Sequence, residues 1–275
     1  METVSMTLKN GEVVESASDI HRAFRAGEHV CWLVSSRAEY DAGERELLAH
    51  AAHTRDSVMI VGELVHTRHP APSGAGDPDV HLYRGGSAVL EMLHEQARSV
   101  ARAGRSLRIL AQMEHLAPPQ AGLDDLICRE MDVAELADHG ATSVVCAYRH
   151  SAWSRELLSG VSTVHSHVVG AASGAAGFRI ARTGSGVWAV HGEIGYEGAA
   201  SFAAALRALL TRYTRLRLDC TQLELIDAAG WQALIATATA SPGALVLLER
   251  VNDTVAAAWQ LSGYDDETIP VQVRS

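Results

Sequence analysis

The chain has 275 residues, which suits one large domain or two small ones, and 47% of them are hydrophobic, which is ample for real cores. Its formal net charge of −10 at pH 7, with no basic stretch, argues against a nucleic-acid-binding surface. The four cysteines are scattered, and neither a signal-peptide pattern nor a run of roughly 18 apolar residues stands out, so we expect a cytoplasmic protein with reduced thiols and no membrane contact.

A polar leader is expected at residues 1–18, followed by a first domain at residues 19–170. Apolar runs predict buried strands at residues 29–34, 57–61, 80–83, 106–113 and 143–148, and residues 165–169 close the domain. Helices are predicted at residues 39–53, 87–104, 123–138 and 156–161, the second of them capped by Ser87. Residues 70–78 are predicted to be a loop. Strands that alternate with helices indicate a parallel sheet with crossover connections.

Fourteen histidines raise the question of a metal site, since zinc needs about four ligands. The best candidate clusters are His29 with Cys31, Cys146 with His150, and His165 with His167. Residues i and i+2 on a strand share a face, so His29 and Cys31 can also be plain core neighbours. Three interpretations stay open: a metal site, a small-molecule pocket lined by His29, Cys31, Cys146 or His165, and core packing. Our expectation is a ligand pocket without a metal or another cofactor.

The sequence gives little support for a catalytic site. The segment Gly85-Gly86-Ser87 lacks the GxSxG nucleophile pattern, and Ser87 is better explained as a helix cap. The acidic run at residues 265–267 is typical of a solvated loop. Asp124 and Asp125 lie at a helix start, where the helix dipole favours carboxylates. We therefore expect no catalytic residues and no enzyme activity.

The first domain resembles the MEDS sensory family, on the segments GEHVCWLV, ARAGRSLRILAQME, CREMDVAELADHGATSVVCAY and VHSHVV. It departs at Gln112, where an acidic residue is expected, and at His165-Ser166, where the family often has His-Pro. The family is similar to RecA/KaiC-type ATPases, which implies a parallel α/β sheet. A Gly-rich loop ending in Lys-Ser/Thr is missing here, so we expect no ATP hydrolysis. The resemblance implies sensing of small hydrocarbon derivatives.

A small-residue linker at residues 171–177 leads to a second domain at residues 178–275. A strand pair is predicted at residues 178–182 and 187–191, followed by a helix at 198–213 and a strand at 215–220. Residues 244–248 read as a strand buried on both faces. Val255, Trp259 and Leu261 indicate a last helix, and residues 269–273 a last strand.

The segment LELIDAAGWQAL, residues 223–234, predicts a turn into a helix that begins after Asp227, a good N-cap, and ends near residues 241–243. A helix N-terminus favours negative charge and is a natural place for a phosphate. Trp231 lies in the first helical turn, so we expect it to be partly exposed and to contact a partner.

This segment resembles the signature of the STAS domain of anti-anti-sigma factors. In that family the helix start usually reads Asp-Ser-Ser-Gly, and an anti-sigma kinase phosphorylates the Ser beside the Gly. The two Ser positions are Ala228 and Ala229 here, which cannot accept a phosphoryl group. The resemblance implies a partner-binding surface at Asp227, Ala228, Ala229, Gly230 and Trp231.

Together these resemblances predict a signalling regulator similar to an anti-sigma factor antagonist. Its expected partners are an anti-sigma factor with serine-kinase activity or another STAS protein, with a small molecule as ligand of the first domain and self-association as a further expectation. The alternative is a small-molecule-binding protein whose STAS domain is a dimerisation scaffold. A cryptic enzyme built on the first domain is the third hypothesis.

Overall fold

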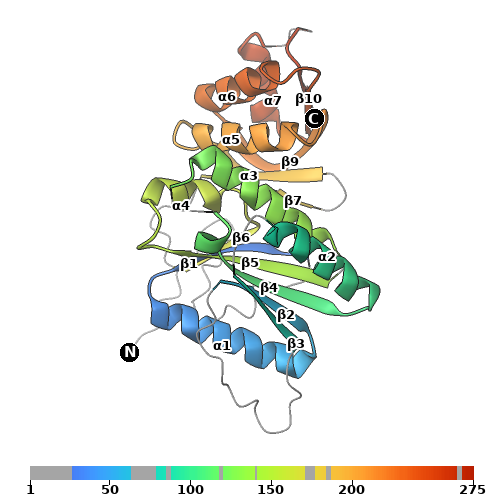
Figure 1. The fold of residues 1–275 in the computed structure, drawn as a ribbon. Helices are drawn as coiled ribbons and strands as arrows, with labels where there is room; N and C mark the ends of the chain where they lie inside the picture. Colours follow the sequence, from blue (N-terminus) through green and yellow to red (C-terminus); the bar gives the residue numbers. More distant parts are fainter. Residues whose placement is uncertain are drawn as a thin grey trace.

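The computed structural model describes residues 27–62, 79–84, 88–117, 120–139, 141–170, 177–183, 187–264 and 268–275. The chain folds into two α/β domains that lie one above the other (Figure 1). This confirms the predicted fold class. The predicted leader, the loop at residues 70–78 and most of the predicted linker lie outside the described residues.

The first domain is built on six parallel strands in the order β3-β2-β4-β5-β1-β6. Their bounds are β1 His29–Val34, β2 Ser57–Val61, β3 Asp79–Tyr83, β4 Ser106–Gln112, β5 Ala141–Arg149 and β6 His167–Val169. The parallel sheet predicted from the alternation of strands and helices is confirmed. The last strand begins at His167, so His165 precedes it in a turn.

Helices cover both faces of this sheet. They are α1 Arg37–Thr54, α2 Val89–Arg102, α3 Leu123–Ala134 and α4 Arg155–Ser162, with short 3₁₀ turns at Met113–His115 and Glu135–Asp138. Alternate residues of β1 serve the two layers: Trp32 packs with α1, whereas Cys31 faces the side of α2, α3 and α4. The N-cap of α2 is Ala88 rather than the predicted Ser87, which lies outside the described residues.

The second domain has a five-stranded mixed sheet in the order β11-β10-β9-β8-β7, with β7 and β8 antiparallel. The strands are β7 Phe178–Arg182, β8 Val187–Ile194, β9 Arg215–Ile226, β10 Leu245–Glu249 and β11 Val271–Arg274, and the helices are α5 Ala199–Leu210, α6 Ala228–Thr239 and α7 Asp253–Leu261. The strand β9 is longer than predicted and continues to the residue before Asp227. Its parallel pairing with β8 extends to Ile194 and Ile226, which explains why the chain stays extended up to the helix start.

The two domains pack directly against each other through α3 and α5 (Figure 1). Ile127, Met131 and Ala134 of α3 belong to one hydrophobic cluster with the core of the second domain, including Phe202 and Ala208 of α5. Polar contacts surround this packing: Arg212 pairs with Asp132 and Glu135, Arg207 pairs with Asp124, and the Ile180 N–H donates to the Thr163 carbonyl over 2.6 Å. The domains therefore form one packed unit. None of the described helices is long and apolar enough to cross a membrane.

Candidate functional site

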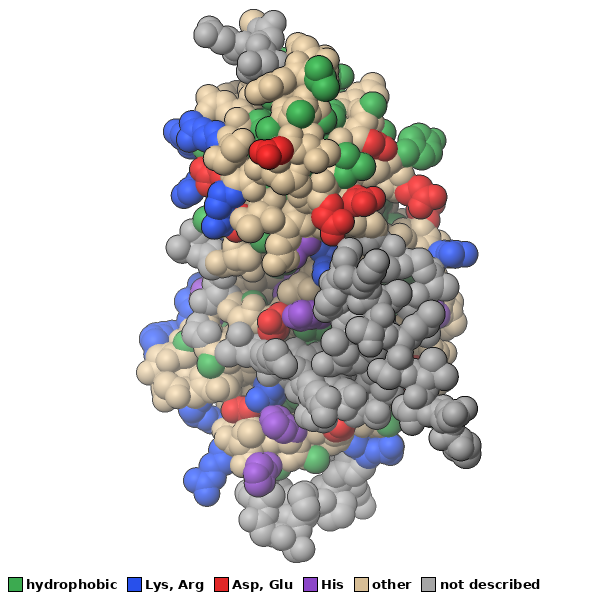
Figure 2. All heavy atoms as spheres, turned by 180° about the vertical axis from the view of Figure 1, so that it is seen from behind, with side chains coloured by type: hydrophobic (Ala, Val, Ile, Leu, Met, Phe, Trp, Pro, Cys, Tyr) green, Lys and Arg blue, Asp and Glu red, His purple; other side chains and the backbone are tan. Residues whose placement is uncertain are grey.

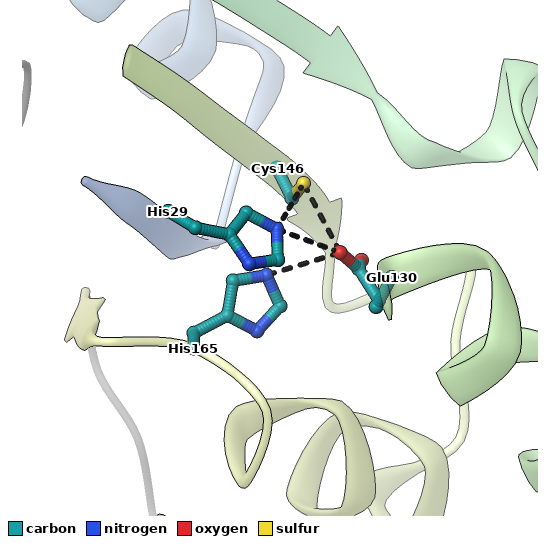
Figure 3. Close-up of side chains that lie close together, drawn as sticks. All are labelled: His29, Glu130, Cys146 and His165. Carbon is teal, nitrogen blue, oxygen red and sulfur yellow. Dashed lines mark hydrogen bonds and ion pairs between the residues drawn. The ribbon is translucent and has the colours of Figure 1, made fainter. Parts of the chain in front are cut away.

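Four polar side chains from distant parts of the chain meet inside the first domain. His29 comes from the start of β1, Glu130 from α3, Cys146 from β5 and His165 from the turn between α4 and β6. All four are buried, and one potential ligand atom of each lies within 4.8 Å of the others. Figure 3 shows the four side chains pointing toward one another. We call this group the buried cluster.

Glu130 lies at the centre of the buried cluster, and its two oxygens have different partners. Oε1 accepts a hydrogen bond from the Tyr148 hydroxyl. Oε2 lies 3.0 Å from His29 Nε2, 3.2 Å from His165 Nε2 and 3.3 Å from Cys146 Sγ. Cys146 Sγ is also 3.4 Å from His29 Nε2. One carboxylate oxygen thus faces two imidazoles and a thiol.

Backbone groups orient both imidazole rings. His165 Nδ1 is 2.7 Å from the Val161 carbonyl, which can only accept, so this nitrogen carries the hydrogen. The His29 ring likewise has a hydrogen bond with the backbone of Val164, besides its Nε2 contact with Glu130. The two ring centroids are 4.1 Å apart. Each ring therefore turns Nε2 toward Glu130.

Burial sets the protonation of the cluster. Burial, followed by the proximity of His165, lowers the pKa of His29 to about 4, so this imidazole is neutral at pH 7. Burial alone would raise the pKa of Glu130, but the two histidines beside it hold that pKa well below its usual range. Burial and the Glu130 charge raise the pKa of Cys146 and of Tyr148 well above their usual values. Glu130 is therefore a buried carboxylate whose neighbours are two imidazoles, a thiol and a phenol.

A cavity of about 620 Å³ adjoins the cluster and lies between the two domains. Its lining from the first domain includes His29, Val164 and Ala134, and the second domain contributes Arg179 and His191 among others. His29 belongs both to this lining and to the buried cluster. The cavity therefore reaches one of the four residues of the buried cluster.

Three of the four residues predicted to line a pocket, His29, Cys146 and His165, come together in the buried cluster. Cys31 lies beside it, as the parallel-pairing partner of Cys146, and its thiol bonds to Ser162. Sequence reasoning missed Glu130 and Tyr148. The signal for Glu130 is its position on an apolar stripe of α3, four residues after Leu126 and three before Val133.

The start of α6 is the second candidate site. Asp227 is the N-cap as predicted: its Oδ1 accepts from the Gly230 N–H and its Oδ2 from the Tyr196 N–H, both over 2.9 Å. The Asp227 carboxylate thus already supplies negative charge to this helix end, which disfavours the phosphate expected there. Ala228 is exposed and Ala229 is half-buried.

Two of the predicted partner-binding residues are not on the surface. Trp231 is only 3% exposed and packs against Trp259, with ring centroids 5.1 Å apart, so its predicted partial exposure is wrong. The ring is large and apolar, and it fills the space between α6 and α7. Gly230 is buried because α6 approaches β8 closely: a Cβ at this position would lie 2.8 Å from Ile194 Cγ2.

The exposed side chains around this helix start are acidic or hydrophobic: Glu193, Tyr196, Glu197, Glu224 and Leu225. Tyr196 is 83% exposed and Leu225 is 37% exposed. Figure 2 shows acidic and hydrophobic side chains near one another on one flank of the second domain. Such a surface suits a protein partner better than a nucleic acid.

Two family models match the chain. Residues 28–166 match the MEDS family, described as MEthanogen/methylotroph, DcmR Sensory domain. Residues 178–272 match the family described as Mlab, STAS domain. A search of curated proteins found no matching relative. Because the first match covers just over half of the chain and the second follows it directly, the chain belongs to the MEDS family and carries a STAS domain behind its sensory domain.

Proposed function

We propose that the protein is a non-enzymatic cytoplasmic regulator, in which the state of the MEDS domain controls how the STAS domain binds a protein partner. The presence of these two domains supports a signalling or regulatory role in general. The partner that we propose is an anti-sigma factor with serine-kinase activity or another STAS protein. The observation that carries the proposal is that α3 belongs to both the buried cluster and the domain interface.

The helix α3 has two buried faces. Leu126 and Val133 pack in the core of the MEDS domain on either side of Glu130 along the helix. Ile127, which follows Leu126, and Met131, which follows Glu130, pack into the hydrophobic cluster of the STAS domain. Close-packed interiors do not deform continuously, so a ligand that moves or rotates Glu130 must also change the packing of α3 on α5.

The STAS domain extends this route to the proposed partner surface. The helix α5 packs against α3 on one side and against α6 on another. Phe202 and Leu206 of α5 share a hydrophobic cluster with Trp231 and Leu234 of α6. A change at α3 therefore reaches the helix that begins at Asp227 through contiguous side-chain packing.

A small molecule is the proposed ligand of the MEDS domain. The interdomain cavity supports this, because its volume of about 620 Å³ lies within the range of ligand pockets, roughly 300–1,000 Å³. Its polar lining includes Arg179, Arg182, His167 and His191, which suits a ligand with an acceptor group such as a carbonyl or carboxylate. Since both domains line the cavity, an occupant contacts both at once.

The helix start lacks the usual release mechanism. Ala228 and Ala229 have no hydroxyl, so a kinase partner cannot dissociate itself by phosphorylating them. The proposed interaction is therefore controlled by the ligand state of the MEDS domain.

Affinity capture of the intact protein from a lysate of its own cells, read by mass spectrometry, tests the partner. The variant Ala229→Glu puts a negative charge where a phosphoserine would stand in the family. Ala236→Glu adds the same charge at an exposed position two turns later on α6 and is the matched control. We expect an anti-sigma kinase or STAS protein with the native chain and the control, and its loss with Ala229→Glu. The same partners with all three proteins, or no protein of either class with any of them, would contradict the proposal.

A further inference from the structure

The buried cluster gathers four lone-pair atoms around one point. These are His29 Nε2, His165 Nε2, Cys146 Sγ and Glu130 Oε2 (Figure 3). In the described part of the chain, these four side chains form a group whose ligand atoms lie close enough together to hold a metal ion. The four residues come from β1, α3, β5 and the turn after α4, so the fold itself brings them together.

The hydrogen-bond pattern fixes which ring atom of each histidine faces the centre of the cluster. The Nδ1 hydrogen of His165 goes to the Val161 carbonyl, so Nε2 is the nitrogen that this ring turns toward Glu130. His29 has a backbone bond at Val164 and also turns Nε2 toward Glu130. Two ring nitrogens thus face one carboxylate oxygen at 3.0 and 3.2 Å, and each can coordinate a cation through its lone pair once it carries no hydrogen.

The spacing of these atoms fits a tetrahedral ion. Zinc bonds of about 2.0–2.3 Å at tetrahedral angles place neighbouring ligand atoms about 3.3–3.7 Å apart. Of the six separations among Glu130 Oε2, Cys146 Sγ and the two Nε2 atoms, four are 3.0, 3.2, 3.3 and 3.4 Å, and the other two are at most 4.8 Å. Small outward shifts of the side chains therefore make room for one ion at the centre.

The donor types and the charge balance favour a divalent transition-metal ion. Imidazole and thiolate bind zinc-like transition ions, whereas Mg²⁺ and Ca²⁺ prefer oxygen ligands. When Cys146 loses its thiol proton to solvent on binding, one thiolate and one carboxylate neutralise a divalent ion, and the two imidazoles add no charge. A neutral site is what a fully buried position favours.

Outer groups hold the ligands in these orientations. Tyr148 donates to Glu130 Oε1 and leaves Oε2 for the centre. The Val161 carbonyl fixes His165 through Nδ1. Metal-ligating histidines and carboxylates are usually oriented by such partners.

We propose that the buried cluster binds one divalent transition-metal ion, zinc being the expected one, through His29 Nε2, His165 Nε2, Cys146 Sγ and Glu130 Oε2. The proposal differs from the expectation of no metal because the sequence alone does not place Glu130 beside the two histidines. The ion fastens α3 to β1 and β5, and the cavity beside His29 is its entrance. The role of the ion as a signal rests on the proposed function, but its binding does not depend on any protein partner.

Cobalt(II) titration of the chelator-treated, reduced, full-length protein tests the site, with zinc as competitor. We expect one cobalt per chain, a thiolate-to-cobalt charge-transfer band in the near ultraviolet, visible bands of tetrahedral cobalt, and displacement by zinc. Cys146→Ser should lose the charge-transfer band. Tyr148→Phe keeps all four ligands and should bind about 10–100-fold more weakly.

Two controls separate the cluster from other thiols and histidines. Cys220→Ser changes a buried cysteine of the STAS domain, and His94→Gln breaks the half-buried pair in which His94 Nδ1 lies 3.2 Å from His139 Nε2. Both should bind cobalt like the native chain. Circular dichroism checks folding, and Tyr148→Phe carries the test if Cys146→Ser does not fold.

The proposal is overturned if the folded native protein takes up no cobalt, if the thiolate band survives Cys146→Ser, or if Tyr148→Phe binds as tightly as the native chain. Because no partner is present in this titration, a failure here is distinct from a failure of the partner-binding proposal.

Discussion

The two domains place their characteristic polar groups in opposite positions. In the MEDS domain, His29, Glu130, Cys146 and His165 are buried and face one another. In the STAS domain, the Asp227 carboxylate lies at a helix start whose neighbours Ala228 and Tyr196 are exposed. A buried cluster is accessible only to an ion or a small molecule, whereas an exposed helix start is accessible to a protein. The difference agrees with the proposed division between a ligand-binding domain and a partner-binding domain.

The interface between the two domains determines whether a change in one domain can reach the other. Without the packing of α3 on α5, the two domains would be independent units on one chain. With it, the helix that carries Glu130 also carries Met131 into the core of the STAS domain. Substitutions at Trp231, Met131, Asp227 and Arg207 test, in turn, the core behind the proposed partner surface, the interface, the helix cap and the peripheral ion pair.

The largest effect is expected at Trp231, which belongs to the core behind the proposed partner surface and not to the surface itself. Trp231→Ala should lower the free energy of unfolding by about 3–5 kcal/mol, because it empties the space against Trp259. Tyr196 is an exposed aromatic residue nearby, and Tyr196→Ala should change the free energy of unfolding by less than about 0.5 kcal/mol. Urea unfolding followed by circular dichroism measures both, and equal effects would contradict the assignment of Trp231 to the core.

Met131 tests the interface. Met131→Ala should cost about 2–5 kcal/mol of unfolding free energy, because the cavity opens between the two domains. The same substitution at Met92, which is 38% exposed on α2, should be close to neutral. If Met131→Ala leaves the unfolding midpoint at the native value, the domains do not stabilise each other through α3.

These sites differ in how well the sequence predicted them. The strands of both sheets and the N-cap Asp227 follow from local patterns, since hydrophobic runs and capping residues act over a few positions. The burial of Glu130 depends on β1, β5 and the turn at His165, which are distant in sequence, and an acidic residue in a helix ordinarily faces solvent. Trp231 was misassigned because its exposure depends on the position of Trp259 in another helix.

Local sequence patterns also do not predict how the two domains pack against each other. Ile127 and Met131 extend the apolar face of α3 beyond what one sheet can cover, but the sequence does not say which surface covers the remainder.

A smaller effect is expected at the surface cap. Asp227→Ala removes the acceptor for the Gly230 and Tyr196 N–H groups and should cost about 0.5–2 kcal/mol of unfolding free energy. Asp227→Asn keeps an acceptor for the helix end and should retain most of the stability. Thermal unfolding of the two variants compares them, and an alanine variant as stable as the native protein would refute the capping role.

The smallest effect is expected at the rim of the interface. Arg207 and Asp124 form an ion pair between α5 and α3, but their side chains are 50% and 63% exposed. Arg207→Ala should therefore change the unfolding free energy by less than about 1 kcal/mol. A loss as large as that of Met131→Ala would show that charge pairing, rather than apolar packing, holds the domains together.

The central claim is that the state of the buried cluster reaches the STAS domain through α3, and hydrogen exchange of the intact protein tests it most directly. Glu130→Gln disturbs the cluster, while Glu44→Gln makes the same change at a fully buried glutamate of α1, on the opposite face of the sheet. We predict faster amide exchange in α5 for Glu130→Gln and native exchange in α5 for Glu44→Gln. Native exchange in α5 for Glu130→Gln, or an equal increase for both variants, would contradict the account.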